Sequence, residues 1–396
     1  MPTECPQLTV GLVPEGGPNW IAGVIYLENL TRALLTLGAD RIDVCFIAGP
    51  TYQMGWENNL TVAVPVHRYT HSAQDSWLQA AWNTLKARCL PRTLETVATR
   101  TRLRLLFPLQ SPPSVQLPVP WIGWIPDFQH KRRPEFFSVA HRIERDTRFR
   151  RIVDEATHVV VSSEDARADL MRWFPTSQAR VSVLQFRSVL DRAWFDLDPL
   201  KVAERFDLPA KFLTYPSQLW AHKNHRTAVE ALSLLKARGS TDVVLICTGR
   251  EYDHRHPEYA DALKEEIVRR ELQSQVRFLG LLDRATQIQI MRRSAAVVQL
   301  SVFEGWSALL EDSRALGKQV LVSDIPVHRE QNAHDAVYFN PENAEEFADL
   351  IEREWPHLEP GPDLGREQRA RENQEKLTYD FACRFKDIVE RATRAT

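Results

Sequence analysis

Short runs of apolar residues alternate with segments of helical periodicity along the whole chain. The apolar runs are continuous rather than alternating, which is typical of strands that are buried on both faces of a parallel sheet. In the first half, strands are expected at residues 7–14, 43–49, 60–67, 103–109, 120–127, 157–163 and 181–187. In the second half, they are expected at residues 211–217, 243–249, 276–280, 295–301, 319–324 and 336–340. Helical segments lie between them, so the sequence predicts a doubly wound α/β fold, present twice.

The length of the chain also indicates two domains. At 396 residues it exceeds the size at which a single core usually stops growing. We expect an N-terminal domain over residues 1–190 and a C-terminal domain over residues 191–370. In the remaining residues, 371–396, amphipathic spacing predicts a helix that crosses back to the first domain. Its apolar face is formed by Leu377, Phe381, Phe385 and Ile388. Ligands bind at the carboxyl ends of the strands in such sheets, so two facing domains should enclose a cleft.

Composition excludes several classes of protein. A hydrophobic content of 43% and a charged content of 26% are those of a globular protein in water. The N-terminus lacks the basic region and apolar core of a secretory signal, and no apolar run approaches the length of a membrane span. The five cysteines are scattered without C-x-x-C spacing, which favours reduced thiols over disulfides or a zinc site. We therefore expect a cytoplasmic protein.

Charge is distributed unevenly along the chain. Residues 1–190 hold 21 Lys and Arg against 17 Asp and Glu, a net charge of +4, which leaves −6 for the rest. The excess lies in residues 86–104 and 130–151, where basic and apolar residues interleave. These segments form either a solvated face whose arginines bond to neighbours, or a patch for an anionic membrane surface or a phosphate-bearing acceptor. Nucleic acid is disfavoured because no binding motif accompanies the charge.

Three carboxylates fall where a buried strand turns into a helix, in SVFEGWSALLEDSRALGK (301–318). If the helix begins near Ser307, Asp312 falls in the middle of its apolar arc and Glu311 at the margin. A buried carboxylate without a partner is costly. Asp312 therefore either meets a buried arginine or backbone amides, or faces a cleft and accepts hydrogen bonds from a polyol.

Glu304 and Ser307 add to this site. Glu304 ends the strand just before Gly305, in a turn where a carboxylate can reach into a cleft. Ser307 opens the helix, where free N–H groups and the positive end of the dipole favour a phosphate. One carboxylate for sugar hydroxyls, amides for a diphosphate and a second carboxylate further on suit a nucleotide sugar.

The same segment resembles the signature of retaining GT-B glycosyltransferases of family 4, roughly S-x-x-E-G-[FW]-x(5)-E with a glycine five residues further on. The residues in register are Ser301, Glu304, Gly305, Trp306 and Gly317. This register puts Asp312, rather than Glu311, on the second glutamate. The resemblance implies that Glu304 contacts the transferred sugar and that Asp312 contacts the ribose hydroxyls.

Other segments extend the resemblance over most of the chain. YPSQLWAHKNHRTAVEAL (215–232) is similar to the family segment in which a lysine and an arginine clamp the diphosphate. Lys223 matches the lysine, whereas Gln218 stands in the arginine position. Leaving-group stabilisation would then depend on Lys223, helix amides, and His222 or His225.

In the first domain, residues 16–34 resemble the glycine-containing loop and helix at the cleft, with Gly23 in register. Residues 125–138 resemble the His-Asp segment that faces the donor sugar. Asp127 matches the aspartate, but Pro126 stands where the histidine often is. His130 lies nearby, and a surface position is expected for it.

The resemblance implies transfer of a sugar from a nucleoside diphosphate to an acceptor hydroxyl, with retention of the anomeric configuration. Lys223 would stabilise the departing diphosphate, and Glu304 and Asp127 would orient the sugar. The donor would be bound by Asp312, Gln218, Gly305, Trp306, Ser307 and Gly23. The acceptor would be a glycan or a lipid-linked glycan in polysaccharide biosynthesis, with possible peripheral contact at the inner face of a membrane.

No metal or other cofactor is expected. The Asp196-x-Asp198 pair has the pattern of a metal site, but Pro199 and a helical pattern follow, so Asp198 is expected to cap a helix.

Alternative functions remain open from the sequence. The fold also suits a nucleotide-sugar epimerase or a phosphorylase. The departures at Gln218 and Pro126 suit a binding or scaffold subunit that has lost turnover. An oxidoreductase is disfavoured because no G-x-G-x-x-G follows a strand.

Overall fold

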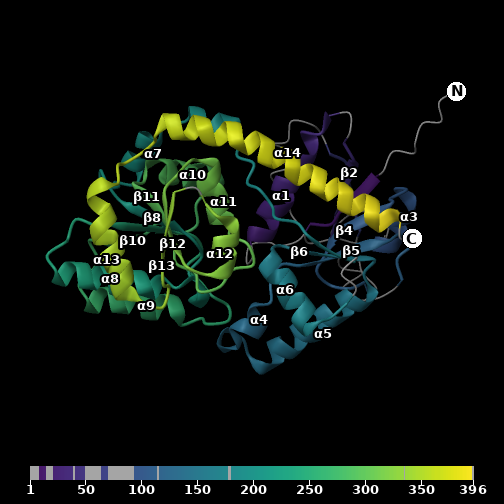
Figure 1. Cartoon of the computed structure of the whole chain (residues 1–396), viewed down its shortest axis with the longest axis horizontal. Helices are drawn as coiled ribbons and strands as arrows, with labels where there is room; N and C mark the ends of the chain where they lie inside the picture. The colour runs from purple at the N-terminus through teal and green to yellow at the C-terminus, as the bar shows by residue number, and fades with distance from the viewer. Residues whose placement is uncertain are drawn as a thin grey trace, which may run out of the picture. The chain divides into compact units, whose positions relative to one another are not determined.

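The computed structural model describes residues 9–14, 21–38, 41–49, 64–69, 93–113, 116–176, 180–333 and 335–394 (Figure 1). These residues form two compact units. Unit 1 contains the described parts of residues 1–128, 140–187 and 376–396. Unit 2 contains the described parts of residues 129–139 and 188–375.

Unit 1 is built on a sheet of seven parallel strands in the order β3-β2-β1-β4-β5-β6-β7. The strands are β1 (Thr9–Leu12), β2 (Asp43–Ala48), β3 (Val66–Arg68), β4 (Leu105–Leu109), β5 (Trp121–Ile125), β6 (His158–Val161) and β7 (Val181–Val183). The main helices are α1 (Ile21–Leu35), α3 (Leu94–Arg100), α5 (Val139–Glu155) and α6 (Glu164–Trp173). Every residue of β4, β5 and β6 is buried, as the continuous apolar runs predict.

Close packing of a helix on this sheet depends on one glycine. A Cβ atom at Gly123 in β5 would lie 2.3 Å from Cγ2 of Ile152 in α5. Only glycine therefore allows α5 to approach the strand so closely.

Unit 2 is built on six parallel strands in the order β10-β9-β8-β11-β12-β13. The strands are β8 (Leu213–Pro216), β9 (Leu245–Thr248), β10 (Val276–Phe278), β11 (Ala296–Gln299), β12 (Val320–Ser323) and β13 (Ala336–Phe339). The α-helices are α4 (Gln129–Arg132), α7 (Pro199–Arg205), α8 (His225–Ala237), α9 (Tyr259–Arg269), α10 (Arg284–Arg293), α11 (Ala308–Ala315), α12 (Pro326–Gln331) and α13 (Ala344–Glu354). Short 3-10 helices are η3 (Pro134–Phe136), η5 (Arg192–Asp196), η6 (Ala221–Lys223) and η7 (Trp355–His357).

The C-terminal helix α14 (Leu364–Arg394) begins before residue 371, where the sequence predicts its start. Its first turns belong to unit 2, where Glu367 pairs with Arg292 at 2.7 Å and both side chains are buried. From residue 376 onwards the helix belongs to unit 1, and Phe385 packs there against Phe107 at a ring-centroid distance of 5.0 Å. The apolar face that the sequence predicts is thus buried at Phe381, Phe385 and Ile388.

Both units are doubly wound parallel sheets covered by helices, which confirms the predicted fold class. Among the described helices, none combines the length and the apolar character that crossing a bilayer requires.

Candidate functional site

The candidate site of unit 2 lies at the point where the strand order reverses. β8 and β11 are neighbours in the middle of the sheet, and the chain continues from β8 to β9 on one side and from β11 to β12 on the other. Ligands of doubly wound sheets bind outside the carboxyl ends of the strands at such a point. The loop after β8 carries Gln218 and Lys223, and the loop after β11 carries Glu304, Gly305 and Trp306.

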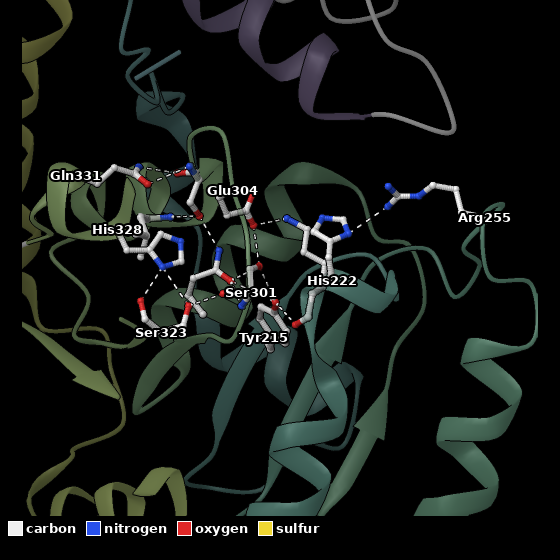
Figure 2. A network of polar contacts seen from close by, with 12 residues as sticks. Tyr215, His222, Arg255, Ser301, Glu304, Ser323, His328 and Gln331 are labelled. Carbon is white, nitrogen blue, oxygen red and sulfur yellow. Dashed lines mark hydrogen bonds and ion pairs between the residues drawn. The ribbon is translucent and has the colours of Figure 1, made fainter. Parts of the chain in front are cut away.

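Lys223 and Glu304 meet in this place. Nζ of Lys223 forms an ion pair with Oε1 of Glu304, and their side chains are only 20% and 10% exposed. Oγ of Ser301 donates to the same carboxylate oxygen at 2.7 Å. The hydroxyl of Tyr215 donates to the carbonyl of Lys223 at 2.7 Å, which fixes the loop beneath the ammonium group. Figure 2 shows Glu304 and Ser301 between His222 and Arg255 on one side and Gln331 and His328 on the other.

The start of α11 is held by side chains from other elements. Oγ of Ser307 accepts from the backbone N–H of Leu310, as an N-cap does, and also accepts from Nε2 of Gln299 at 2.7 Å. The backbone N–H of Ser307 donates to Oε1 of Gln331 at 3.0 Å. This N–H group, expected to be free for a phosphate, is engaged by Gln331 in the structure.

Asp312 is paired, as one of the two alternatives from the sequence requires. The residue is 2% exposed, so its predicted place in the buried arc is correct. Its Oδ1 atom accepts from Nη2 of Arg284 and, at 2.6 Å, from Oγ of Ser188. Arg284 opens α10 and its side chain is 22% exposed. A ribose contact for Asp312 stays a prediction, and it must coexist with this pair.

Glu311 differs from the expectation. Instead of lying at the margin of the buried arc, it is completely buried. Nε2 of Gln331 donates to its Oε1 at 3.2 Å, and Nε of Arg314 lies 3.6 Å from its Oε2. These two partners explain how a carboxylate is tolerated there.

His328 was missed by the sequence reasoning. Nδ1 of this fully buried imidazole lies 2.9 Å from the carbonyl of Ser323, so Nδ1 carries the proton and donates. Burial is the main reason why the pKa of His328 falls from 6.5 to about 4, and the charges of Glu304 and Lys223 act on it in opposite directions. The ring is therefore neutral at physiological pH, and its Nε2 atom has no hydrogen-bond partner in the described part of the chain.

Gln218 occupies a tightly constrained loop. Gly249, which follows β9 with a φ of +129°, lies against it, and a Cβ there would be 2.6 Å from the carbonyl oxygen of Ser217. The amide nitrogen of Gln218 is buried without a hydrogen-bond partner among the described residues. A neutral donor thus stands where the resemblance implies an arginine.

Two predicted site residues belong to unit 1. Nη2 of Arg145 in α5 binds Oδ1 of Asp127 at 2.7 Å, and Gly23 is buried within α1. Their roles stay predictions. His130 in α4 is 1% exposed, so the expected surface position is wrong, and its ring packs edge-on against Phe137.

The structure describes no metal cluster. In the described ranges, no group of three or more His, Cys, Asp and Glu side chains is arranged to hold an ion. Oδ1 of Asp198 accepts from the N–H of Leu200 at 2.9 Å and caps α7, as predicted from the sequence. Independence of the reaction from metal ions stays a prediction.

Comparison with known proteins covers both the sequence and the fold. Residues 198–357 match the family described as Glycosyl transferases group 1. The O-antigen chain mannosyltransferase RfbU of Salmonella typhimurium is 28% identical over 163 residues, which cover 41% of this chain and 41% of that protein. The chain thus matches less than half of the length of this curated relative.

Solved structures extend the likeness to nearly the whole chain. A glycosyltransferase from Rickettsia africae ESF-5 superposes with a TM-score of 0.65 at 17% identity, covering 99% of both chains. Anabaena Alr3699/HepE in complex with UDP and glucose gives a TM-score of 0.63 at 16% identity, covering 96% of this chain and 98% of that one. The comparisons do not favour the alternative functions. The solved structures show the GT-B fold of two Rossmann-like domains, and the match to the group 1 family covers residues 198–357, less than half of the chain.

Proposed function

We propose that the protein is a retaining hexosyltransferase that moves a sugar from a nucleoside diphosphate to a hydroxyl group of a glycan or lipid-linked glycan. The observation that carries this proposal is the Lys223–Glu304 pair at the carboxyl ends of β8 and β11. It places one cation and one carboxylate where a doubly wound sheet binds its ligand. The relatives support the same chemistry, since RfbU is named a mannosyltransferase and HepE was solved with UDP and glucose.

In the proposed reaction, the bond between the anomeric carbon and the diphosphate breaks, and the acceptor oxygen bonds to the same face of the sugar. The acceptor proton passes to the departing phosphate oxygen. Lys223 neutralises the charge that develops on the diphosphate, and Glu304 accepts hydrogen bonds from the sugar hydroxyls. Asp127 orients the sugar and Asp312 binds the ribose. No metal ion is required in this scheme, because the lysine and loop donors supply the electrophilic stabilisation.

The donor assay tests this proposal directly. Thermal unfolding is followed with UDP-, GDP-, ADP- and dTDP-sugars, and a donor at 100 times its Kd should add about 2.7 kcal/mol to the stability. Product formed from the best donor is then examined by NMR, and retention predicts the donor's anomeric configuration in the product. Transfer should continue in excess EDTA. The proposal fails if no nucleotide sugar shifts the unfolding transition.

The Lys223→Ala variant tests the assigned leaving-group role. It should lower kcat for transfer more than it weakens nucleoside binding, because the ammonium group acts on charge that grows in the transition state. Lys376→Ala serves as the matched control, since that lysine is 79% exposed on α14. Equal losses in turnover and nucleoside affinity would remove the role assigned to Lys223.

We also propose that the basic segments contact an anionic membrane surface that carries the acceptor. Of these segments, residues 93–104 and 130–151 are described and residues 86–92 are not. Ile143 of α5 is 62% exposed, which supports insertion of an apolar side chain. Several arginines of α5 already have acidic partners, namely Arg145 with Asp127, Arg148 with Glu144, Arg150 with Asp154 and Arg151 with Glu155. Stronger sedimentation with phosphatidylglycerol than with phosphatidylcholine vesicles would support contact, and equal binding would refute it.

A further inference from the structure

The loop that carries Lys223 is flanked by a second cation in the same unit. Gln218 is neutral, so Lys223 alone supplies positive charge from this loop. Arg255 follows β9 and reaches the same loop through His222, the residue directly before Lys223. This contact suggests how the chain compensates for the glutamine.

Arg255 is held in a fixed position. Its side chain is 8% exposed, and its guanidinium lies between two rings, 4.8 Å from the centroid of Phe137 and 4.9 Å from that of Trp220. Nη1 donates to Oε1 of Gln129 at 3.1 Å, and Nη2 lies 3.1 Å from Nδ1 of His222. Stacking and two directed hydrogen bonds together leave the guanidinium little freedom.

Asp253 connects the loop that carries Lys223 to the loop after β9 that carries Arg255. The residue is completely buried, and its Oδ2 accepts from the backbone N–H of Ala221 at 3.1 Å. Its Oδ1 accepts from the backbone N–H of Arg255 at 3.0 Å. On the other side, the N–H of Val302 donates to the carbonyl of His222 at 3.0 Å, which connects His222 to the Glu304 loop. The imidazole of His222 is therefore placed by its backbone as well as by Arg255.

The contact with Arg255 decides which nitrogen of His222 carries the proton. A guanidinium has donors only, so Nδ1 of His222 must accept and the proton of the neutral ring must lie on Nε2. Burial, followed by the positive charges of Lys223 and Arg255, holds the pKa of His222 well below its usual value. The ring therefore presents an N–H donor beside Lys223 at all physiological pH values.

We propose that His222, fixed as its Nε2–H tautomer by Arg255, donates a hydrogen bond to the diphosphate of the donor. Together with the amide of Gln218, it takes the place of the arginine that the chain lacks. His222 is then a binding residue, and Arg255 is a positioning residue that acts through it. This inference rests on the proposed use of a nucleoside diphosphate.

The test compares diphosphate with monophosphate binding in the full-length protein. Isothermal titration with UDP, GDP, ADP and dTDP, and with the corresponding monophosphates, measures the preference for the diphosphate without requiring the sugar or the acceptor. His222→Asn and Arg255→Met should weaken binding of the preferred diphosphate about tenfold, because the first removes the hydrogen bond to the charged diphosphate and the second removes the contact that holds His222 in the donating tautomer. Binding of the monophosphate should change less than about twofold, since it leaves the distal phosphate position empty.

Matched variants separate this role from a structural one. In His222→Gln, the amide nitrogen replaces Nε2 and should retain most of the diphosphate preference, whereas asparagine replaces Nδ1 and should not. Arg255→Lys keeps a donor for Nδ1 and should also retain the preference. Arg269→Met is the control for loss of an arginine, because that residue is 71% exposed on α9.

The outcomes distinguish the two proposals. If the wild-type protein binds none of these diphosphates, the proposed function fails and this inference falls with it. If the wild type prefers a diphosphate and folded His222→Asn keeps that preference, only this inference is overturned. If Arg255→Met does not fold, the comparison of His222→Asn with His222→Gln decides alone, and equal affinities of these two variants for the diphosphate would refute the inference.

Discussion

Replacing Glu304 with glutamine should tighten binding of a nucleoside diphosphate that carries no sugar. The ammonium group of Lys223 is engaged by Glu304 in the structure. A diphosphate must loosen this pair before the lysine can turn to it. Glutamine keeps the shape of the side chain but removes the competing charge.

The magnitude follows from the burial of the pair. Exposed ion pairs contribute at most about 1 kcal/mol, whereas breaking a buried pair costs about 3 to 5 kcal/mol. With side chains 20% and 10% exposed, and with Ser301 as a second partner of the carboxylate, the pair lies between these cases. We expect release of Lys223 to contribute about 1 to 2 kcal/mol, which lowers the Kd for the diphosphate about 5- to 30-fold.

Titration calorimetry with UDP and GDP measures the change in Kd, and a transfer assay measures the accompanying change in turnover. Turnover of Glu304→Gln should fall, because the sugar hydroxyls lose a charged acceptor. Glu342→Gln is the control, since that carboxylate is 61% exposed and pairs with Arg133. If Glu304→Gln binds the preferred diphosphate no more tightly than the wild type, the lysine and the ligand do not compete, and the reasoning is refuted.

Three further predictions concern the stability of unit 2. Gly249→Ala should lower the free energy of unfolding by about 2 kcal/mol or more, because φ is +129° and Cβ would meet a backbone carbonyl oxygen at 2.6 Å. Gly239→Ala, with φ at +92° in open space, should cost less in the same urea titration. Arg284→Met should cost about 2 to 4 kcal/mol by leaving Asp312 buried without its cation, and an unchanged urea midpoint would contradict this. The third prediction concerns His328, whose native pKa of about 4 lies below the unfolded value of 6.5. Between these two pH values the unfolded state binds more protons than the native state, so the free energy of unfolding falls as the pH drops from 6.5 towards 4. Relative to His328→Asn, the wild type should lose about 1 kcal/mol between pH 7 and 5.5, and a constant difference would rule out this linkage.

The fold was largely predictable because strands buried on both faces must be apolar throughout. AAVVQL, for example, contains β11, of which every residue is buried. The expected strand at 60–67 was less accurate: β3 spans Val66–Arg68 and is partly exposed, and residues 60–63 lie outside the described ranges. An edge strand with one neighbour has a weaker apolar signal. The inclusion of residues 129–139 in unit 2 had no signal in the sequence, since the assignment depends on long-range contacts such as that of Gln129 with Arg255.

The burial of Asp312 was predictable from the sequence, but the side-chain pairings around it were not. Helical spacing correctly predicted that Asp312 is buried, yet it could not choose between ligand and arginine. Arg284 lies 28 residues earlier, on another helix, and nothing in the intervening sequence marks the two as partners. Gln331, which organises the start of α11 from 24 residues away, was missed for the same reason. Partners brought together by the ends of different strands leave no periodic pattern.

The chain passes between its two units at residues 128, 139, 187 and 375, so neither unit is an uninterrupted stretch of polypeptide. A single cut cannot release either unit whole. A fragment beginning at residue 188 would lack Gln129 and Phe137, which hold Arg255, and would retain Phe385 without the aromatic neighbour that covers it in unit 1. Expression of such a fragment alone would therefore expose apolar surface on α14 and remove two contacts that hold Arg255. Nucleotide affinity should accordingly be measured on the full-length polypeptide.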